Sequence, residues 1–226
     1  TGRIQPKTQI KISADVSAKI KKIAVREGQW VEKGAFLVGL DRERYLAAVE
    51  SAEANVRSAQ ANATLVKQNL EQARKEFERS KELLARELTS PSEHDAKQTA
   101  WQVEAARYES AQEQVAQARA TLKQAKDDLS KTTIYAPMSG TVSELNKEEG
   151  EIALGSQFQA DVILVIADLS EMEARVDVDE NDIVSIRPGQ PAEIQADALL
   201  GNALKGSVHE IGSSANASGS GTQDQK

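Results

Sequence analysis

The sequence predicts an elongated, multidomain α+β protein: a small β-sandwich interrupted by a long antiparallel helical hairpin and followed by a partial β-barrel. Three observations predict this class. A strand-turn-strand pattern at residues 14–34 occurs again at residues 136–155. Between the two copies, small and apolar residues recur at steps of three and four. Beyond residue 168 the apolar residues alternate with polar ones again, which is typical of strands.

The two copies of the strand pattern align without a gap up to their Glu-Gly turns, at a constant offset (150 − 28 = 122). Glycine suits these turns because a positive φ costs it nothing. Neither copy can bury its apolar face alone, so we expect residues 13–41 and 132–168 to pack as two halves of one sandwich. The aligned pairs are Ala14 and Ala136, Val16 and Met138, Ile20 and Val142, Ile23 and Leu145, and Gly28 and Gly150.

The segment between the halves, residues 42–131, has the repeat of a coiled coil, sustained in its first helix for about five heptads. Each of its two helices runs for about 40 residues, hence about 60 Å. In the first helix the seam positions are Val49, Ala52, Val56, Ala59, Ala63, Val66, Leu70, Ala73, Phe77, Ser80 and Leu84. In the second they are Trp101, Tyr108, Ala111, Val115, Ala118, Leu122, Ala125 and Leu129. The second series falters where Glu104 occupies the seam position beside the apolar Val103.

The text "LTSPSEHD" predicts a tight reversal between the helices, with the tip at about residues 83–92. Ser90 can cap the second helix, Pro91 fits its first position, and Glu93 completes a capping box. Asp41 is the candidate cap of the first helix.

The remaining segments predict an incomplete barrel at residues 169–212. Strands are expected at "EMEARVDV", "PAEIQADAL" and "KGSVHEIG", with a short helix at "DENDIVSI" capped by Asp179. Either residues 1–12 supply a further strand to this barrel or the rest of it is absent from the chain; we assign residues 1–12 to the barrel. Residues 213–226 are rich in Ser, Gly, Asn and Gln, which predicts a flexible loop or a disordered end.

Composition excludes several classes of function. The chain has no cysteine and two histidines, His94 and His209, which we interpret as structural or surface residues, so a metal site or a histidine-centred triad has almost nothing to be built from. A formal charge of −7 argues against binding to nucleic acid. We therefore expect no enzyme activity, no metal and no cofactor. No apolar run reaches the roughly 18 to 20 residues that cross a bilayer.

A duplicated sandwich of this kind also occurs in the lipoyl or biotinyl carrier domains of enzymes, which attach a cofactor to a lysine between the halves. Here the hairpin occupies that junction, and no "DKA" or "MKM" triplet exists. A second alternative is a structural coiled-coil scaffold, which leaves the duplicated halves unexplained.

The halves "VSAKIKKIAVREGQWVEKGAFLVGLD" and "IYAPMSGTVSELNKEEG", and the text "LVIADLSEMEARVDVDENDIVSIRPGQPAEI" that follows them, resemble the periplasmic adaptors, or membrane fusion proteins, of the HlyD/AcrA/MacA superfamily. Within this superfamily, the quoted stretches most resemble those of MacA-type adaptors. The resemblance implies a lipoyl-like sandwich and a homohexameric conduit in the periplasm of a Gram-negative bacterium. It implies a TolC-like outer-membrane channel and an inner-membrane ABC transporter of the MacB kind, or alternatively an RND pump, as partners. Anchoring to the inner membrane would come from residues absent from this chain.

Two sets of site residues follow from the resemblance. Adaptors that dock on TolC-like channels carry R-x3-L-x6-S at the hairpin tip, which matches Arg79, Leu83 and Ser90. Each residue also has an ordinary interpretation: Arg79 as a solvated charge, Leu83 as helix packing and Ser90 as an N-cap. In MacA-like adaptors a glutamine of the lipoyl domain lines the channel as a gate, and this position falls on Gln157 or, because the loop is one residue longer, on Gln159.

Overall fold

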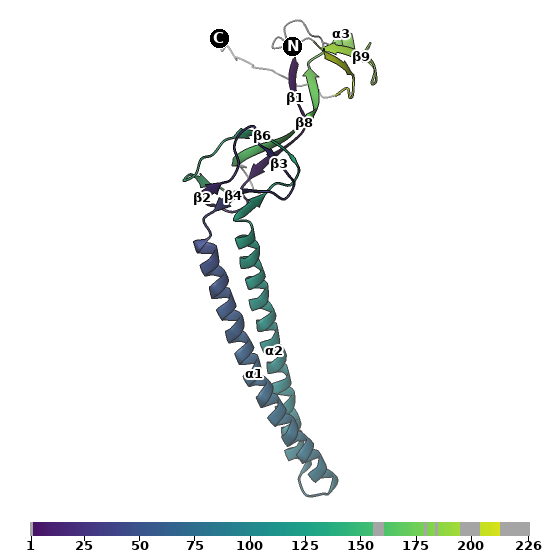
Figure 1. The fold of residues 1–226 in the computed structure, drawn as a ribbon. Coiled ribbons are helices and arrows are strands. Elements are labelled where there is room, and N and C mark those ends of the chain that lie inside the picture. Colours follow the sequence, from purple (N-terminus) through teal and green to yellow (C-terminus); the bar gives the residue numbers. More distant parts are fainter. Residues whose placement is uncertain (1, 156–160, 179, 184, 195–203, 213–226) are drawn as a thin grey trace, which may run out of the picture. The chain divides into compact units, whose positions relative to one another are not determined.

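The computed structural model describes residues 2–155, 161–178, 180–183, 185–194 and 204–212. The chain divides into two compact units: Thr8–Leu169 forms one, and Thr1–Lys7 with Ser170–Lys226 forms the other. Figure 1 shows the elements of both. The predicted α+β class, with a sandwich, a helical hairpin and further strands, is confirmed.

The sandwich consists of two four-stranded sheets, with strand orders β1-β8-β6-β3 and β5-β4-β2-β7. Its core is made of large aliphatic side chains from both halves that are almost fully buried, which is what stabilises a small sandwich. The strands are β1 (Gly2–Ser13), β2 (Ala18–Ile23), β3 (Trp30–Val31), β4 (Phe36–Leu40), β5 (Thr133–Tyr135), β6 (Gly140–Leu145), β7 (Ile152–Ala153) and β8 (Val162–Val176). The most deeply buried core residues are Ile20, Leu37, Val38, Leu40, Val142, Ile163, Leu164 and Ile166.

The halves exchange strands. β3 of the first half pairs with β6 of the second, and β7 of the second half pairs with β2 of the first. The hydrogen bonds repeat across the duplication: the Gly28 N–H donates to the Val142 carbonyl at 2.8 Å, and the Gly150 N–H donates to the Ile20 carbonyl at 2.9 Å. Both glycines have a positive φ, 76° and 99°. The duplication read from the sequence is therefore a pseudo-twofold relation within one module.

The glutamates of the two Glu-Gly turns make the same reciprocal contact with their carboxylates. Glu27 Oε1 accepts the backbone N–H of Leu145 at 2.9 Å, and Glu149 Oε1 accepts the backbone N–H of Ile23 at 2.7 Å. Each half thus ties down the end of a strand of the other half.

The hairpin consists of α1 (Glu43–Ala85) and α2 (Pro91–Ser130), which run antiparallel (Figure 1). Every predicted seam residue of both helices is buried or half-buried. At the irregular point of the second helix, Glu104 takes the half-buried seam position and Val103 is exposed.

The start of α1 differs in detail from the prediction. The helix begins at Glu43, so Arg42 stands at the N-cap position and makes no side-chain cap hydrogen bond. Asp41 contributes from one residue earlier, since its Oδ1 accepts the Glu43 N–H at 3.1 Å.

The second unit contains the N-terminal part of β1, the C-terminal part of β8, α3 (Glu180–Ile183), β9 (Pro191–Ile194) and β10 (Leu204–Ser207). β9 and β10 form an antiparallel pair. The N-terminal strand is divided between the units after Lys7, whereas the sequence predicts that all of residues 1–12 belong to the barrel. The difference arises because Ile12 is buried in the sandwich core. Asp179 and residues 213–226 lie outside the described residues. No helix in the described part of the chain is long and apolar enough to span a bilayer.

Candidate docking site at the hairpin tip

The end of α1 closes in a Schellman motif. The Glu87 N–H donates to the Leu84 carbonyl at 3.0 Å, and the Leu88 N–H donates to the Leu83 carbonyl at 2.9 Å. Glu87 has the left-handed conformation that this motif requires, with φ 59°. The carbonyl groups of Leu83 and Leu84, near the end of α1, are therefore satisfied within the turn.

The start of α2 is capped as the sequence predicts. The Ser90 side chain accepts the Glu93 N–H at 3.2 Å, and Pro91 is the first helical residue. The Glu93 carboxylate does not reach back as in a full capping box: it accepts a hydrogen bond from the Thr89 hydroxyl at 2.8 Å. Both helix ends at the tip are thus closed by local hydrogen bonds.

The three motif residues lie at this end of the hairpin. Arg79 and Leu83 are four residues apart on α1, so they share one face, and both are exposed. Arg79 forms no ion pair among the described residues, which leaves its guanidinium open to a partner. Ser90 is also exposed, although its oxygen serves the N-cap.

A stack of rings joins the two helices below the tip. Phe77 of α1 stacks on both His94 and Trp101 of α2, with ring centroids 5.3 Å apart in each pair. The buried Ser80 hydroxyl lies 3.1 Å from His94 Nδ1. His94 therefore has the structural role that the sequence suggested for it, and the stack gives the tip a rigid base.

An ion pair crosses between the helices at the same level. Lys97 Nζ lies 2.8 Å from Glu76 Oε2. The hydrogen bond from Lys97, with a further one from Gln72, holds the pKa of Glu76 below its usual value, and the same pair raises the pKa of Lys97. Both groups are exposed to solvent, so the pair positions the helices more than it stabilises them.

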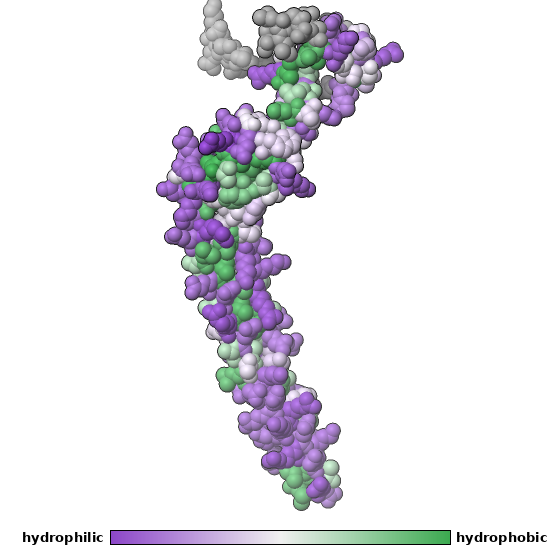
Figure 2. Space-filling view, in the orientation of Figure 1, coloured by the Kyte–Doolittle hydropathy of each residue, from purple (hydrophilic) through white to green (hydrophobic). Residues whose placement is uncertain are grey.

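Sequence reasoning missed Leu88, a leucine in the turn itself whose surface is 68% exposed. Figure 2 shows apolar surface at the free end of the hairpin, beyond a strongly hydrophilic stretch. An apolar residue inside the polar text "ARELTS" was the available signal.

The gate candidates Gln157 and Gln159 lie outside the described residues. The residues on either side of them are tied together, because the Leu154 N–H donates to Asp161 Oδ2 at 3.0 Å. Lys147 Nζ lies 3.2 Å from the other oxygen of this carboxylate. The backbone N–H of Leu154 and, after it, the ammonium of Lys147 hold the pKa of Asp161 below its usual value.

The tip of the hairpin is the candidate docking surface. Within the described ranges, no three His, Asp or Glu side chains are grouped so that they could hold a metal ion. The tip combines an exposed arginine, a residue type enriched at interaction hot spots, with exposed leucines.

Two curated relatives match most of this chain. The macrolide export protein MacA of Escherichia coli O157:H7 is 29% identical over 192 residues, which cover 85% of this chain and 52% of that protein. The pyoverdine export membrane fusion protein PvdR of Pseudomonas aeruginosa is 32% identical over 210 residues, 93% of this chain and 54% of that protein. The chain thus spans about half the length of the curated relatives it matches.

Solved structures and a family profile agree with these matches. The crystal structure of MacA from Actinobacillus actinomycetemcomitans superposes with a TM-score of 0.87 at 25% identity, over 94% of this chain and 65% of that one. The membrane fusion protein Spr0693 from Streptococcus pneumoniae R6, at 19% identity over 96% of this chain and 83% of that one, shares the fold with a TM-score of 0.69. The profile described as "RND MFP, barrel-sandwich hybrid domain" matches residues 8–167, well over half of the chain. The chain therefore belongs to the membrane fusion protein family, as an adaptor of the MacA type.

Proposed function

We propose that this protein is the periplasmic adaptor subunit of a tripartite efflux or export system, linking an inner-membrane transporter to a TolC-like outer-membrane channel. The hairpin carries the proposal. It is inserted between two strand-exchanged halves of one sandwich, and it presents an exposed Arg79 and Leu83 on one face beside its tip. The adaptor performs no chemistry, and the transporter supplies the energy.

Docking occurs at the tip. Leu83 enters an apolar groove between helices of the channel, and Arg79 pairs with a carboxylate or with carbonyl groups at its rim. Ser90, at the apex, donates a hydrogen bond from its hydroxyl group to the channel, while its oxygen still accepts the N-cap hydrogen bond from the Glu93 N–H.

The inner-membrane partner is an ABC transporter of the MacB kind. Similarity to two MacA proteins, one in sequence and one in structure, supports this choice. The family profile carries the RND class in its description, which favours an RND pump as the second candidate. Capture of the protein by a purified MacB-type transporter in detergent, but not by an RND pump, is the expected result; the reverse pattern selects the second candidate.

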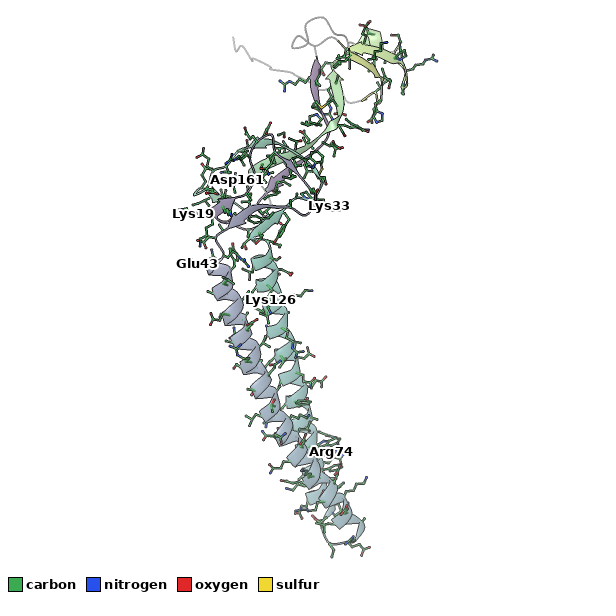
Figure 3. The ribbon with its side chains drawn as sticks, in the orientation of Figure 1. Lys19, Lys33, Glu43, Arg74, Lys126 and Asp161 are labelled. Carbon is green, nitrogen blue, oxygen red and sulfur yellow. The ribbon has the colours of Figure 1, made fainter. Side chains whose placement is uncertain are left out.

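Copies of the adaptor associate side by side through the sandwich to form a conduit. Trp30 on β3 and Ile152 on β7 occupy equivalent positions of the duplication, on edge strands, and are 58% and 60% exposed. Figure 3 labels Lys33, which follows β3 in the chain, and Lys19, the strand partner of Ile152, on opposite sides of the sandwich. Large apolar residues on two opposite edges support a head-to-tail contact that closes into a ring. The number of six copies rests on the family resemblance.

Docking is tested by surface plasmon resonance on an immobilised, purified TolC-type channel. We expect Arg79→Asp and Leu83→Asp each to weaken capture by at least about tenfold, the loss of one interface hot spot. Arg74→Asp is the matched control, since Arg74 is an exposed arginine of α1 that pairs with Glu78 of its own helix at 2.9 Å, further from the tip.

Circular dichroism must show the same helicity in all variants. Capture of both tip variants at the strength of the unmodified protein, or an equal loss in Arg74→Asp, would contradict docking through this face.

A further inference from the structure

Leu88 is presented to solvent by the backbone rather than by chance. It stands at the second position beyond the C-cap Arg86, where the Schellman hydrogen bond from its N–H to the Leu83 carbonyl fixes its direction. In this motif the side chain at that position frequently contacts the one at the position of Leu83. The turn therefore links the two leucines of the tip through the backbone, and both remain exposed, at 68% for Leu88 and 37% for Leu83.

The backbone of the turn is strained in this arrangement. Glu87 occupies a left-handed position that glycine fills without strain, whereas a residue with a Cβ is strained there. A closed turn also has few conformations to lose on binding, so an anchor carried by it binds with a small entropic cost. An exposed leucine held in this way has the properties of a pre-organised binding residue.

The charges around the leucines indicate which charge the partner surface carries. Residues 79–90 carry three cations and two carboxylates, a net positive segment in a chain whose formal charge is −7. Two of the cations, Arg79 and Arg86, lie on either side of Leu83 in the chain. The complementary surface is an apolar socket with an acidic rim.

We propose that Leu88 is a second apolar anchor of the tip, which enters such a socket on the outer-membrane channel together with Leu83. This inference rests on the proposed docking function and adds to it a residue outside the R-x3-L-x6-S spacing. It also makes the tip apolar on both sides of the turn, so that the channel is recognised by the reversal itself and not by α1 alone.

The test compares leucines of similar exposure at the tip and on the shaft, in the full 226-residue chain. Leu88→Ala is expected to weaken binding to an immobilised TolC-type channel by about tenfold or more, chiefly through faster dissociation. Leu88→Met is expected to stay within about threefold, because it preserves apolar volume. The control Leu65→Ala removes a shaft leucine that is 62% exposed, and it is expected to bind as the unmodified protein does.

Binding of Arg79→Asp distinguishes failure of the Leu88 proposal from failure of the docking function on which it rests. If Arg79→Asp loses binding and Leu88→Ala does not, docking stands and the second anchor is overturned. If the unmodified protein does not bind, or Arg79→Asp and Leu83→Asp both bind normally, docking itself fails. An equal loss in Leu65→Ala also overturns the special role of Leu88.

A parallel measurement with phosphatidylethanolamine and phosphatidylglycerol vesicles distinguishes a lipid surface as the occupant. No vesicle binding by the unmodified protein is the expected result. Vesicle binding that is lost in Leu88→Ala, with channel binding unchanged, would overturn the proposal in favour of the membrane.

Discussion

The seam of the hairpin contains a carboxylate, Glu104, at a position where the repeat calls for a small or apolar side chain. Its side chain is only 18% exposed, and its Oε1 accepts a hydrogen bond from Arg107 Nη1 at 2.6 Å. Its Oε2 is buried and has no hydrogen-bond partner in the part of the chain that the structure describes. We predict that Glu104→Leu stabilises the hairpin.

The magnitude follows from these contacts. A buried oxygen left without a partner costs roughly 1 to 3 kcal/mol, and the ion pair with the exposed Arg107 contributes about 0 to 1 kcal/mol that the substitution would lose. A solvent-open depression of about 210 Å³ borders Glu104, lined also by Ala73 and the polar residues Asn69, Gln72 and Glu76, so a leucine at this position is not overpacked. Glu104→Leu should therefore raise the free energy of unfolding by roughly 1 to 2 kcal/mol.

Chemical denaturation followed by far-ultraviolet circular dichroism measures this change. The chain has two tryptophans, so a Trp30→Phe background leaves Trp101, which stacks on Phe77 in the same third of the hairpin, as a local fluorescent probe. Val103→Leu, at the exposed neighbouring position, is the control and should change stability by no more than about 0.5 kcal/mol. A Glu104→Leu protein no more stable than the parent would show that the buried carboxylate is satisfied, and the reasoning would fail.

Three further predictions concern the sandwich. Gly28→Ala and Gly150→Ala should each cost about 1 to 2 kcal/mol, because both force a Cβ into a positive-φ position; clearly unequal losses on denaturation would contradict the equivalence of the halves. The backbone N–H and the ammonium that hold the pKa of Asp161 low make its stabilising contribution fully present above the ordinary aspartate pKa and lost as the pH falls through the lower value of the folded protein. Asp161→Asn should therefore flatten the acid side of a melting-temperature profile, and an unchanged profile would refute this. Trp30→Ser should shift sedimentation toward the monomer at concentrations where the parent associates, whereas unaltered sedimentation would exclude β3 as a contact edge.

The sequence was sufficient for the duplication but not for the way in which the halves combine. The repeat locates the strands and both Glu-Gly turns, because alternation and glycine are local signals. The exchange of β3 and β7 between the halves is not local. Each half could equally have paired its own strands, and packing of the shared core selects between the two pairings. The reciprocal bonds of Glu27 and Glu149 arise from that exchange, so no pattern within one copy predicts them.

Some features of the hairpin can likewise be predicted from the sequence and others cannot. Its seam, its irregular point at Glu104 and the Ser90 cap follow from periodicity and capping chemistry. The Schellman closure does not, because the usual signal is a glycine beyond the helix end and this chain has Glu87 there. Without the closure, Leu88 looks like one more loop residue, and only the structure shows that a backbone hydrogen bond holds this exposed leucine in the turn.

The base of the hairpin explains why a long insertion and a stable sandwich coexist. Leu40, before α1, donates its N–H to the carbonyl of Thr132, after α2, at 2.8 Å, and both residues are almost completely buried. The chain therefore leaves and re-enters the module at one hydrogen-bonded point, so the insertion opens no gap in the core. Because α1 continues from one half and α2 leads into the other, a load on the tip reaches both halves, and the exchanged strands prevent that load from separating them. A sandwich built from two independent halves would lack this resistance, which gives the split arrangement a mechanical reason under the proposed function, in which the protein connects two partners.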